Sequence, residues 1–252
     1  INDASSLSVS STSNLGANVT TSGTQTYTGA VTLSTDVTLT TTDSNVTFSS
    51  TVDSDSAARD LTLTLGSGSA TFSGIVGTTS LADITLNSSA TFNAALTADN
   101  LTIAANKTAT VKDDVTIAST IALSGSSTLA VLNASTMTIA GTITDTGTGN
   151  TISVNDSTAS AAPDEVTFSG TVAADTLTIG SSTTAGKAKF TGSGGVTITN
   201  ITITGGNHAD EDSTGTFNYA LTSTAITLDD NTGDSYLVFA ENNSVTIAGT
   251  ID

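Results

Sequence analysis

Residues 70–96, ATFSGIVGTTSLADITLNSSATFNAAL, contain the pattern that decides the fold of this chain. The stretch opens with ATFSGIV (70–76) and closes with ATFNAAL (90–96), so one short phrase with a central Phe returns at Phe72 and Phe92. Other copies place a large residue at Tyr27, Phe48, Phe168, Phe190 and Phe217, and weaker copies place one at Val111, Leu129, Ile152 and Phe239. A phrase that recurs about every 21 residues predicts stacked repeats rather than one globular core.

Each copy of the phrase predicts a strand. Its large apolar residue lies between small polar ones, which is typical of a half-buried strand with Phe inward and Thr outward. A second phrase, apolar-Thr-apolar, follows most copies, as in ITL (84–86) and LTI (101–103). Each repeat therefore provides at least two short strands, separated by loops rich in Gly, Asn, Asp and Ser.

The length of the repeat narrows the fold. A strand rises about 3.3 Å per residue, so a repeat of about 21 residues spans roughly 70 Å, enough for one lap around a narrow core with three corners. Laps stacked about 4.8 Å apart pair each strand in parallel with its equivalent in the next lap. We therefore predict an all-β parallel β-helix of about eleven coils, with residues 1–252 as a single continuous β-solenoid segment. The intervals between copies vary from 16 to 27 residues, and corner loops absorb such variation.

Composition excludes several functions. The net charge is −18, with only five basic residues, which argues against partners that are nucleic acids or anionic membranes. Thr accounts for 55 of the 252 residues, and its branched side chain favours strands. There is no Cys, so thiolate metal sites are excluded, and no apolar run is long enough for membrane insertion. The chain starts at Ile1 and ends at Asp252 within a repeat, so we expect a fragment of a longer, exported polypeptide.

The phrases VTTSGTQTYTGAVTLSTDVTLTTTDSNVTFSSTVDS (19–54) and ATFSGIVG (70–77) resemble repeats of very large bacterial surface proteins. These are the haemagglutinin-repeat and filamentous-haemagglutinin-like adhesins. The acidic composition, rich in Thr, Ser, Ala and Gly, also resembles segments of surface-layer proteins. The resemblance implies a right-handed β-helix with a structural role outside the cell, on the bacterial surface, and the usual hand of parallel crossovers agrees.

The expected partners follow from this interpretation. Unpaired strand edges at the two ends predict end-to-end self-association or contact with flanking domains of the same protein. A host or cell-surface glycan or protein is the further partner that an adhesin-type rod implies.

A carbohydrate-active β-helix enzyme is the alternative from another class. Such enzymes carry carboxylates with Arg or Lys on an outer face, whereas this chain has one Arg, Arg59, and one His, His208, in the loop-like segment GGNHADEDS (205–213). We expect no enzymatic activity. A groove of carboxylates beside Arg59 or a Lys favours the enzyme, and a smooth exterior of Thr, Ser and Asn favours the rod.

Two acidic clusters are candidate calcium sites, because hard cations prefer several carboxylate and carbonyl oxygens. The first choice is Asp229, Asp230 and Asp234 in DDNTGD (229–234), and the second is Asp210, Glu211 and Asp212. Calcium bound there is predicted to stiffen a corner without any catalytic role. Solvated acidic corners are the competing interpretation.

Alternating Thr residues suggest one more alternative. LTLTL (61–65) and ITNITIT (198–204) place every second Thr outside, as in ice-binding β-solenoids. The unequal spacing of the copies argues instead for ordinary strand propensity and solubility.

Overall fold

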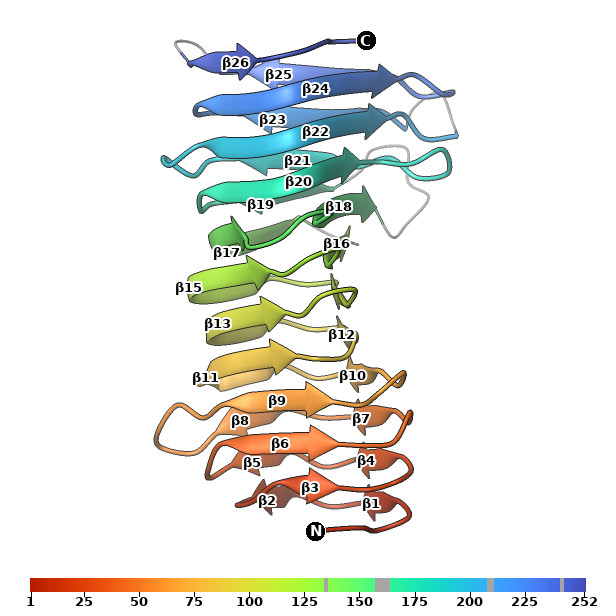
Figure 1. Ribbon diagram of the computed structural model, residues 1–252, viewed down its shortest axis with the longest axis vertical. Helices are drawn as coiled ribbons and strands as arrows, with labels where there is room; N and C mark the ends of the chain where they lie inside the picture. Colours follow the sequence, from red (N-terminus) through yellow and green to blue (C-terminus); the bar gives the residue numbers. More distant parts are fainter. Residues whose placement is uncertain (134–135, 157–163, 208–210, 241–242) are drawn as a thin grey trace.

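The computed structural model describes residues 1–252 except 134–135, 157–163, 208–210 and 241–242, and of Asn133 and Asp156 it describes only the backbone. The described residues form 26 strands and no helix. They stack as a parallel β-solenoid of about ten turns of about 22 residues, which confirms the predicted fold class (Figure 1). Each turn is called a lap below.

The coil is right-handed. From the N-terminus at the bottom of Figure 1, the front strands β6 (Val37–Thr40) and β9 (Leu61–Thr64) run from left to right, and the chain returns behind them while it climbs. This is the hand that parallel crossover connections almost always take.

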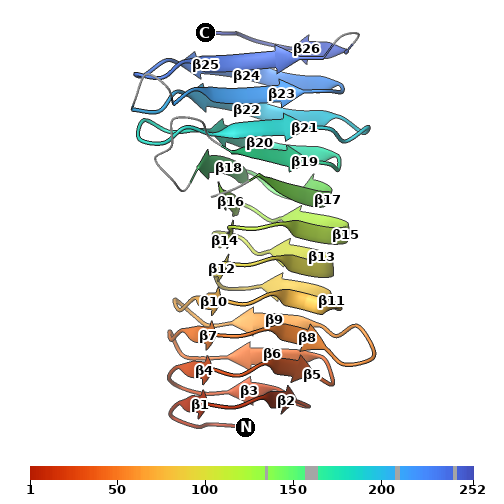
Figure 2. The same cartoon turned by 180° about the vertical axis from the view of Figure 1, so that it is seen from behind.

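Every lap has three faces, each a ladder of parallel strands. The first face, seen as a column of short strands in Figure 2, contains β1 (Leu7–Val9), β4 (Gln25–Tyr27), β7 (Val46–Phe48), β10 (Ala70–Phe72), β12 (Ala90–Phe92), β14 (Thr108–Val111), β16 (Thr128–Asn133), β18 (Thr151–Asp156) and the C-terminal parts of β20 (Val172–Ile179), β22 (Val196–Thr204) and β24 (Leu221–Asp229).

The second face contains β2 (Ser13–Leu15), β5 (Val31–Leu33), β8 (Val52–Ser54), the N-terminal parts of β11 (Val76–Leu86), β13 (Leu96–Ile103), β15 (Val115–Leu123) and β17 (Met137–Asp145), and then β19 (Glu165–Phe168), β21 (Lys187–Phe190), β23 (Ser213–Phe217) and β25 (Ser235–Phe239).

The third face contains β3 (Val19–Thr20), β6, β9, the C-terminal parts of β11, β13, β15 and β17, the N-terminal parts of β20, β22 and β24, and β26 (Val245–Ile247). The sequence predicted at least two strands per lap, and the structure has three faces. In the lower laps each face is a separate strand, whereas long strands such as β13 bend around a corner and cover two faces. The register shift between Ala98 and Asn100 marks that bend.

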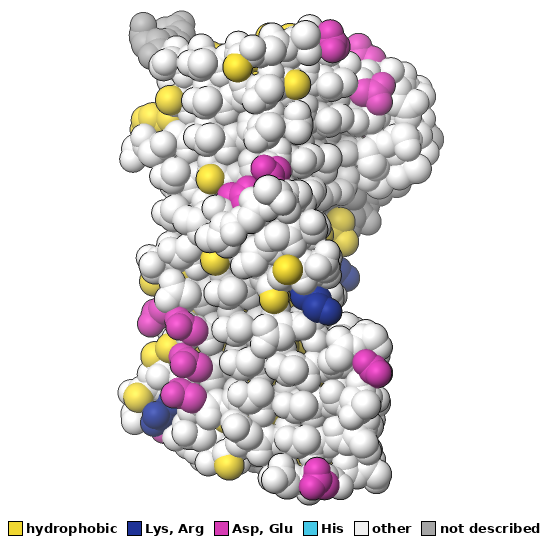
Figure 3. Space-filling model, in the orientation of Figure 1, with side chains coloured by type: hydrophobic (Ala, Val, Ile, Leu, Met, Phe, Trp, Pro, Cys, Tyr) yellow, Lys and Arg dark blue, Asp and Glu magenta, His cyan; other side chains and the backbone are white. Residues whose placement is uncertain are grey.

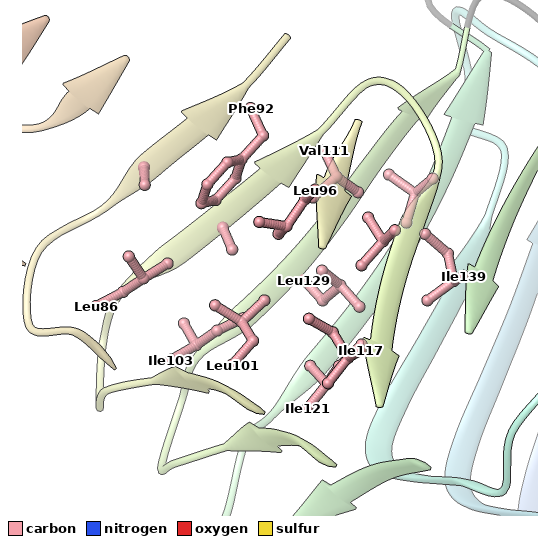
Figure 4. Close-up of a cluster of buried hydrophobic side chains, with 14 of the residues drawn as sticks. Leu86, Phe92, Leu96, Leu101, Ile103, Val111, Ile117, Ile121, Leu129 and Ile139 are labelled. Atoms are coloured by element: carbon pink, nitrogen blue, oxygen red, sulfur yellow. The ribbon is translucent and has the colours of Figure 1, made fainter. Parts of the chain in front are cut away.

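The core is built from inward side chains on all three faces. One lap contributes Ala90 and Phe92, then Leu96 and Ala98, then Leu101 and Ile103, each at most 2% exposed. Figure 4 labels Phe92, Leu96, Leu101 and Ile103 of this set. Small and large side chains alternate in this set, as with Ala90 and Phe92, a combination that suits the close packing of a narrow core.

The aromatic residues stack along the axis. Tyr27, Phe48, Phe72 and Phe92 form one nearly parallel stack on the first face, with ring centroids 5.1, 4.7 and 4.7 Å apart. This confirms the prediction that Phe48, Phe72 and Phe92 point inward in adjacent laps. A second stack joins Phe168, Phe190, Phe217 and Phe239 at 4.9, 4.8 and 6.0 Å.

The two stacks lie on different faces, which corrects the sequence interpretation of one continuous series of copies. Phe168 pairs with Ile139 on the second face. The first-face ladder instead continues from Phe92 through Val111, Val131 and Val154. The 16-residue interval from Ile152 to Phe168 therefore leads from the first face to the second and is not a full lap. The phrase cannot distinguish faces, because inward-outward alternation is the same on all three.

Two of the weaker copies are also out of register with the predicted series. Leu129 and Ile152 pair with each other, but Leu129 pairs with Ala109 and not with Val111. Each lies two residues before the true equivalent of Phe92. Both positions face inward, so alternation alone does not choose between them.

Candidate functional site

The largest departure from the regular lap is a group of loops between the first and second faces of the upper laps. We call the loops 180–186, 204–212 and 229–234 the corner lobe, of which residues 208–210 are outside the described part. They follow β20, β22 and β24 and lie at the right of Figure 1. The same corner takes only residues 28–30 between β4 and β5. Loops held on a rigid scaffold are where binding residues usually lie, so the corner lobe is the candidate site.

Hydrogen bonds between laps hold the corner lobe together. Asn231 donates through Nδ2 to the carbonyl oxygens of Ser182 at 2.9 Å and Gly206 at 3.3 Å, which links three loops. The N–H groups of Thr232 and Gly233 donate to the same Gly206 oxygen at 3.2 and 3.1 Å. The lobe is therefore a stack of braced loops.

Glycine is required where these loops touch. A Cβ at Gly205 would collide with the carbonyl oxygen of Gly233, and one at Gly206 would collide with the Glu211 carboxylate. The Gly-Gly pair thus lets two laps approach at backbone distance, a role that only glycine fills.

Glu211 is the buried carboxylate of the lobe. It is 2% exposed, and its Oε2 accepts a hydrogen bond from the Asn207 N–H at 3.1 Å. The side-chain amide of Asn207, oriented to donate, lies 3.0 Å from the same oxygen. Buried carboxylates need such donors, so Glu211 fastens the turn that contains Asn207.

The other acidic residues of the lobe also accept hydrogen bonds. Asp212 Oδ1 accepts from the Asp234 N–H at 2.9 Å, and Asp230 Oδ1 accepts from the Ser235 N–H at 2.8 Å. Asp234 Oδ2 accepts from the Tyr236 hydroxyl at 2.9 Å. These carboxylates therefore organise the loops that carry them.

The pKa of the Tyr236 hydroxyl is raised by acidic side chains near it. The hydrogen bond to Asp234 raises the pKa of its hydroxyl, and the charges of Asp234, Asp212 and Asp230 raise this pKa further, because they oppose a phenolate. The structure thus brings residues from both sequence-predicted clusters around one phenol. Sequence spacing alone did not predict this meeting.

The predicted calcium ligands are only partly united. Asp234 accepts a hydrogen bond from the Tyr236 hydroxyl, and Asp212 and Asp230 accept the N–H groups of the two residues before Tyr236. Asp229 supplies its carbonyl oxygen to the Gly205 N–H and to the Ser235 hydroxyl, at 3.1 and 3.0 Å. Asp210 lies outside the described residues, as does His208. Within the described part of the chain, no group of three or more His, Cys, Asp or Glu side chains is arranged to hold a metal ion, and calcium binding stays a prediction.

A ladder of Asp and Asn residues at the corner between the second and third faces is a feature that the sequence reasoning missed. The N–H groups of Asp60 and Asp83 donate to the side-chain Oδ1 atoms of Asp36 and Asp60, at 3.1 and 3.0 Å. Asn100 Nδ2 then donates to Asp83 Oδ1 at 2.8 Å, and Asn100 Oδ1 accepts from the Thr120 N–H at 3.2 Å. Acidic side chains form a column along this left edge of the lower laps in Figure 3.

A sequence signal for this ladder exists. An Asp or Asn directly precedes the apolar-Thr-apolar phrase in DVTL (36–39), DLTL (60–63), DITL (83–86) and NLTI (100–103). The side-chain oxygen accepts an N–H from the next lap at the bend, where the regular ladder is interrupted. Part of the negative charge therefore has a structural role.

Two of the basic residues are engaged with acidic ones. Arg59 binds Asp55 in two ways, with Nε–Oδ1 and Nη2–Oδ2 distances of 2.9 Å. Lys189 Nζ lies 3.6 Å from Glu165 Oε1. The hydrogen bond from Arg59 and that from the Ala57 N–H lower the pKa of Asp55. Arg59 therefore clamps its own loop.

Outward Thr residues form a regular column on the first face. Thr26, Thr47, Thr71, Thr91 and Thr110 pair in register through consecutive laps. The column continues through Ala130 and Ser153 to Thr178, Thr202 and Thr227. The unequal spacing of the copies does not disturb this column, because the additional residues lie in the corners.

The described residues contain no helix that is both long and apolar enough to span a membrane. No family model, curated protein or solved structure matches this chain.

Proposed function

We propose that this chain is a structural, rod-forming segment of a bacterial extracellular or cell-surface protein, of the adhesin-stalk or surface-fibre type. The observation that carries the proposal is the single hydrophobic core that the described residues form, from Leu15 to Ile226. Ten to eleven laps about 4.8 Å apart give a rod roughly 50 Å long. The resemblance of residues 19–54 to adhesin repeats supports the location on the cell surface.

The rod is suited to a mechanical task. Ladder hydrogen bonds and stacked rings join each lap to the next, so stability is shared along the axis. The net charge of −18 keeps neighbouring rods apart and soluble. Arg59 is engaged with Asp55 of its own loop, which favours a structural role for this Arg over a role in a carbohydrate-active enzyme.

Two kinds of partner fit the rod. At the upper end, Phe239 and Ile251 are 36% and 54% exposed, which suits another strand layer, from a second copy end to end or from flanking domains of the same protein. The corner lobe offers hydroxyl, amide and carboxylate groups to a host or cell-surface glycan or protein.

Labelling of cells tests the proposal. Antibodies raised against the 252-residue chain should label intact bacteria that express the full protein as strongly as permeabilised ones. A cytoplasmic protein expressed in the same cells is the control, since it should be labelled only after permeabilisation. Labelling of this chain that also requires permeabilisation would overturn the proposed location.

The Thr column favours a second candidate, an ice-binding solenoid. Thr residues in register repeat at the lap spacing of about 4.8 Å, and each offers a methyl group and a hydroxyl in one orientation. A regular column of this kind, with one Thr per lap, can order water along the rod. Inhibition of ice recrystallisation should then be lost in Thr71→Lys, on the first face, and retained in Thr32→Lys, on the second. Wild-type protein without any inhibition would exclude this function.

A further inference from the structure

The middle of the rod contains no aromatic ring. No Phe, Tyr or Trp occurs between Phe92 and Phe168 in the sequence. We call residues 108–145 the link laps; they contain β14–β17, and all but 134–135 are described. Val111, which follows Phe92 in the ladder (Figure 4), and then Val131 occupy the positions above the lower ring stack. The link laps therefore lack the stacked rings that join neighbouring aromatic laps, a contribution beyond the burial of apolar area.

The outer surface of the link laps changes at the same place. Ala122 follows Thr102 on the third face, Ala130 follows Thr110 on the first, and Ala140 follows Thr116 on the second. Ala has a lower strand preference than Thr, because it lacks the branched side chain that packs along a ladder. Each of the three faces thus has an outward Ala in the link laps where the lap below has Thr.

Few residues pair on the third face between the link-lap strand β17 and the strand above it, β20. On the third face only Ile143 is in register with the next lap, at Val172. Gly141, inside β17, has φ +115°, a conformation that favours glycine, and glycine within a strand lowers its stability. A Cβ at Gly170 would collide with the Gly141 carbonyl oxygen, so a residue larger than glycine does not fit at position 170.

We propose that the link laps are a built-in weak point, at which the rod opens before either aromatic block does. The lower block contains the stack from Tyr27 to Phe92, and the upper block contains the stack from Phe168 to Phe239 with the corner lobe. In a solenoid each lap contacts only its neighbours, so local stability follows local composition. The blocks then open separately, and a pulling force extends the rod at its middle while the corner lobe stays folded.

Hydrogen exchange of the whole 252-residue chain tests the proposal. Ladder amides of β14–β17 should exchange about tenfold faster than those of β7–β12 and β19–β23, because they open sub-globally with a smaller free energy. The terminal laps are excluded from the comparison, since ends fray. Equal protection along the interior laps, or faster exchange in β7–β12 or β19–β23, would overturn the proposal.

A surface variant provides the matched test without altering the core. Ala122→Thr combined with Ala130→Thr restores two outward columns and should slow exchange in the link laps by about threefold. Ala225→Thr, in β24 beside Asn200 and separated from the link laps by β20 and β22, is the control and should leave the link laps unchanged. Equal effects of both variants on the link laps, or none from the double variant, would contradict a local weak point.

Discussion

At the residue scale, the stacked rings carry the largest single contributions to the fold. Phe72 is fully buried, and its ring lies 4.7 Å from both Phe48 and Phe92. Phe72→Ala should therefore lower the free energy of unfolding by about 3–5 kcal/mol, through lost burial and the cavity left behind. Chemical denaturation of the wild type and the variant measures this change.

Phe239→Ala is the matched control for Phe72→Ala. Its ring belongs to the second stack but is 36% exposed and tilted, 6.0 Å from Phe217. This substitution should cost less than half as much. Equal costs at the two positions would mean that stacking between two laps adds nothing to the burial of the ring.

A second residue-scale prediction concerns the Asp55–Arg59 clamp. The hydrogen bond from Arg59 lowers the pKa of Asp55, so the clamp is fully formed above the ordinary pKa of Asp. It is lost as the pH falls through the lowered pKa in the folded chain. The NMR signals of the Arg59 Nε–H and the Ala57 amide should shift with a midpoint below the usual Asp range.

Asp55→Asn is the control for this titration. It removes the ionising group while an amide oxygen remains in the position of Oδ1, so both signals should lose the acid transition. A midpoint at the ordinary Asp value in the wild type would show that the contact with Arg59 does not stabilise the carboxylate.

At the element scale, the strands were predictable from sequence and their faces were not. Alternation in ATFNAAL fixes Phe92 inward and Thr91 outward on local grounds, because successive side chains of a strand point to opposite sides. It does not say which side of the lap a strand belongs to. The aromatic residue of the phrase therefore lies on the first face at Phe92 and on the second face at Phe168, although the phrase itself is the same.

The corners were the least predictable elements. From sequence alone, the Asp and Glu residues are interpreted as calcium ligands or solvated charge, whereas Asp36, Asp60 and Asp212 accept N–H groups from the next lap. Such contacts join residues more than 20 positions apart, so they depend on the lap lengths being known. The gathering of Asp212, Asp230 and Asp234 around Tyr236 depends on the same lengths.

The corner lobe allows a direct test of the calcium prediction. If calcium binds there, millimolar calcium should raise Tm by mass action on the folded state. Asp230→Asn should reduce this shift, since it removes a charge while its side-chain oxygen can still accept the Ser235 N–H. Asp36→Asn, in the other acidic corner, should not reduce it. A Tm that responds to neither calcium nor a chelator would leave the acidic lobe as a hydrogen-bonded structural element alone.

At the scale of the whole molecule, the repeat predicted the architecture because every lap needs its neighbours in order to bury its apolar side chains. No lap buries enough apolar surface to fold alone, so neighbours supply the rest. The period was therefore enough to predict a parallel β-solenoid close to the observed lap number and length. The partner of the corner lobe was not predictable, because the repeat specifies stacking and says little about loops that leave the ladder.

The central claim is that the laps stack in order along one axis, and distances between spin labels test it most directly. The chain has no Cys, so pairs of introduced Cys residues can be labelled cleanly at outward positions of the first face. One variant combines Thr47→Cys with Ser153→Cys and the other combines Thr47→Cys with Thr202→Cys, all within the first-face ladder. At about 4.8 Å per lap, pulsed EPR should give distances of roughly 24 and 34 Å, within the length of the labels. Equal distances for the two pairs, or a longer distance for the nearer pair, would contradict the stacked rod.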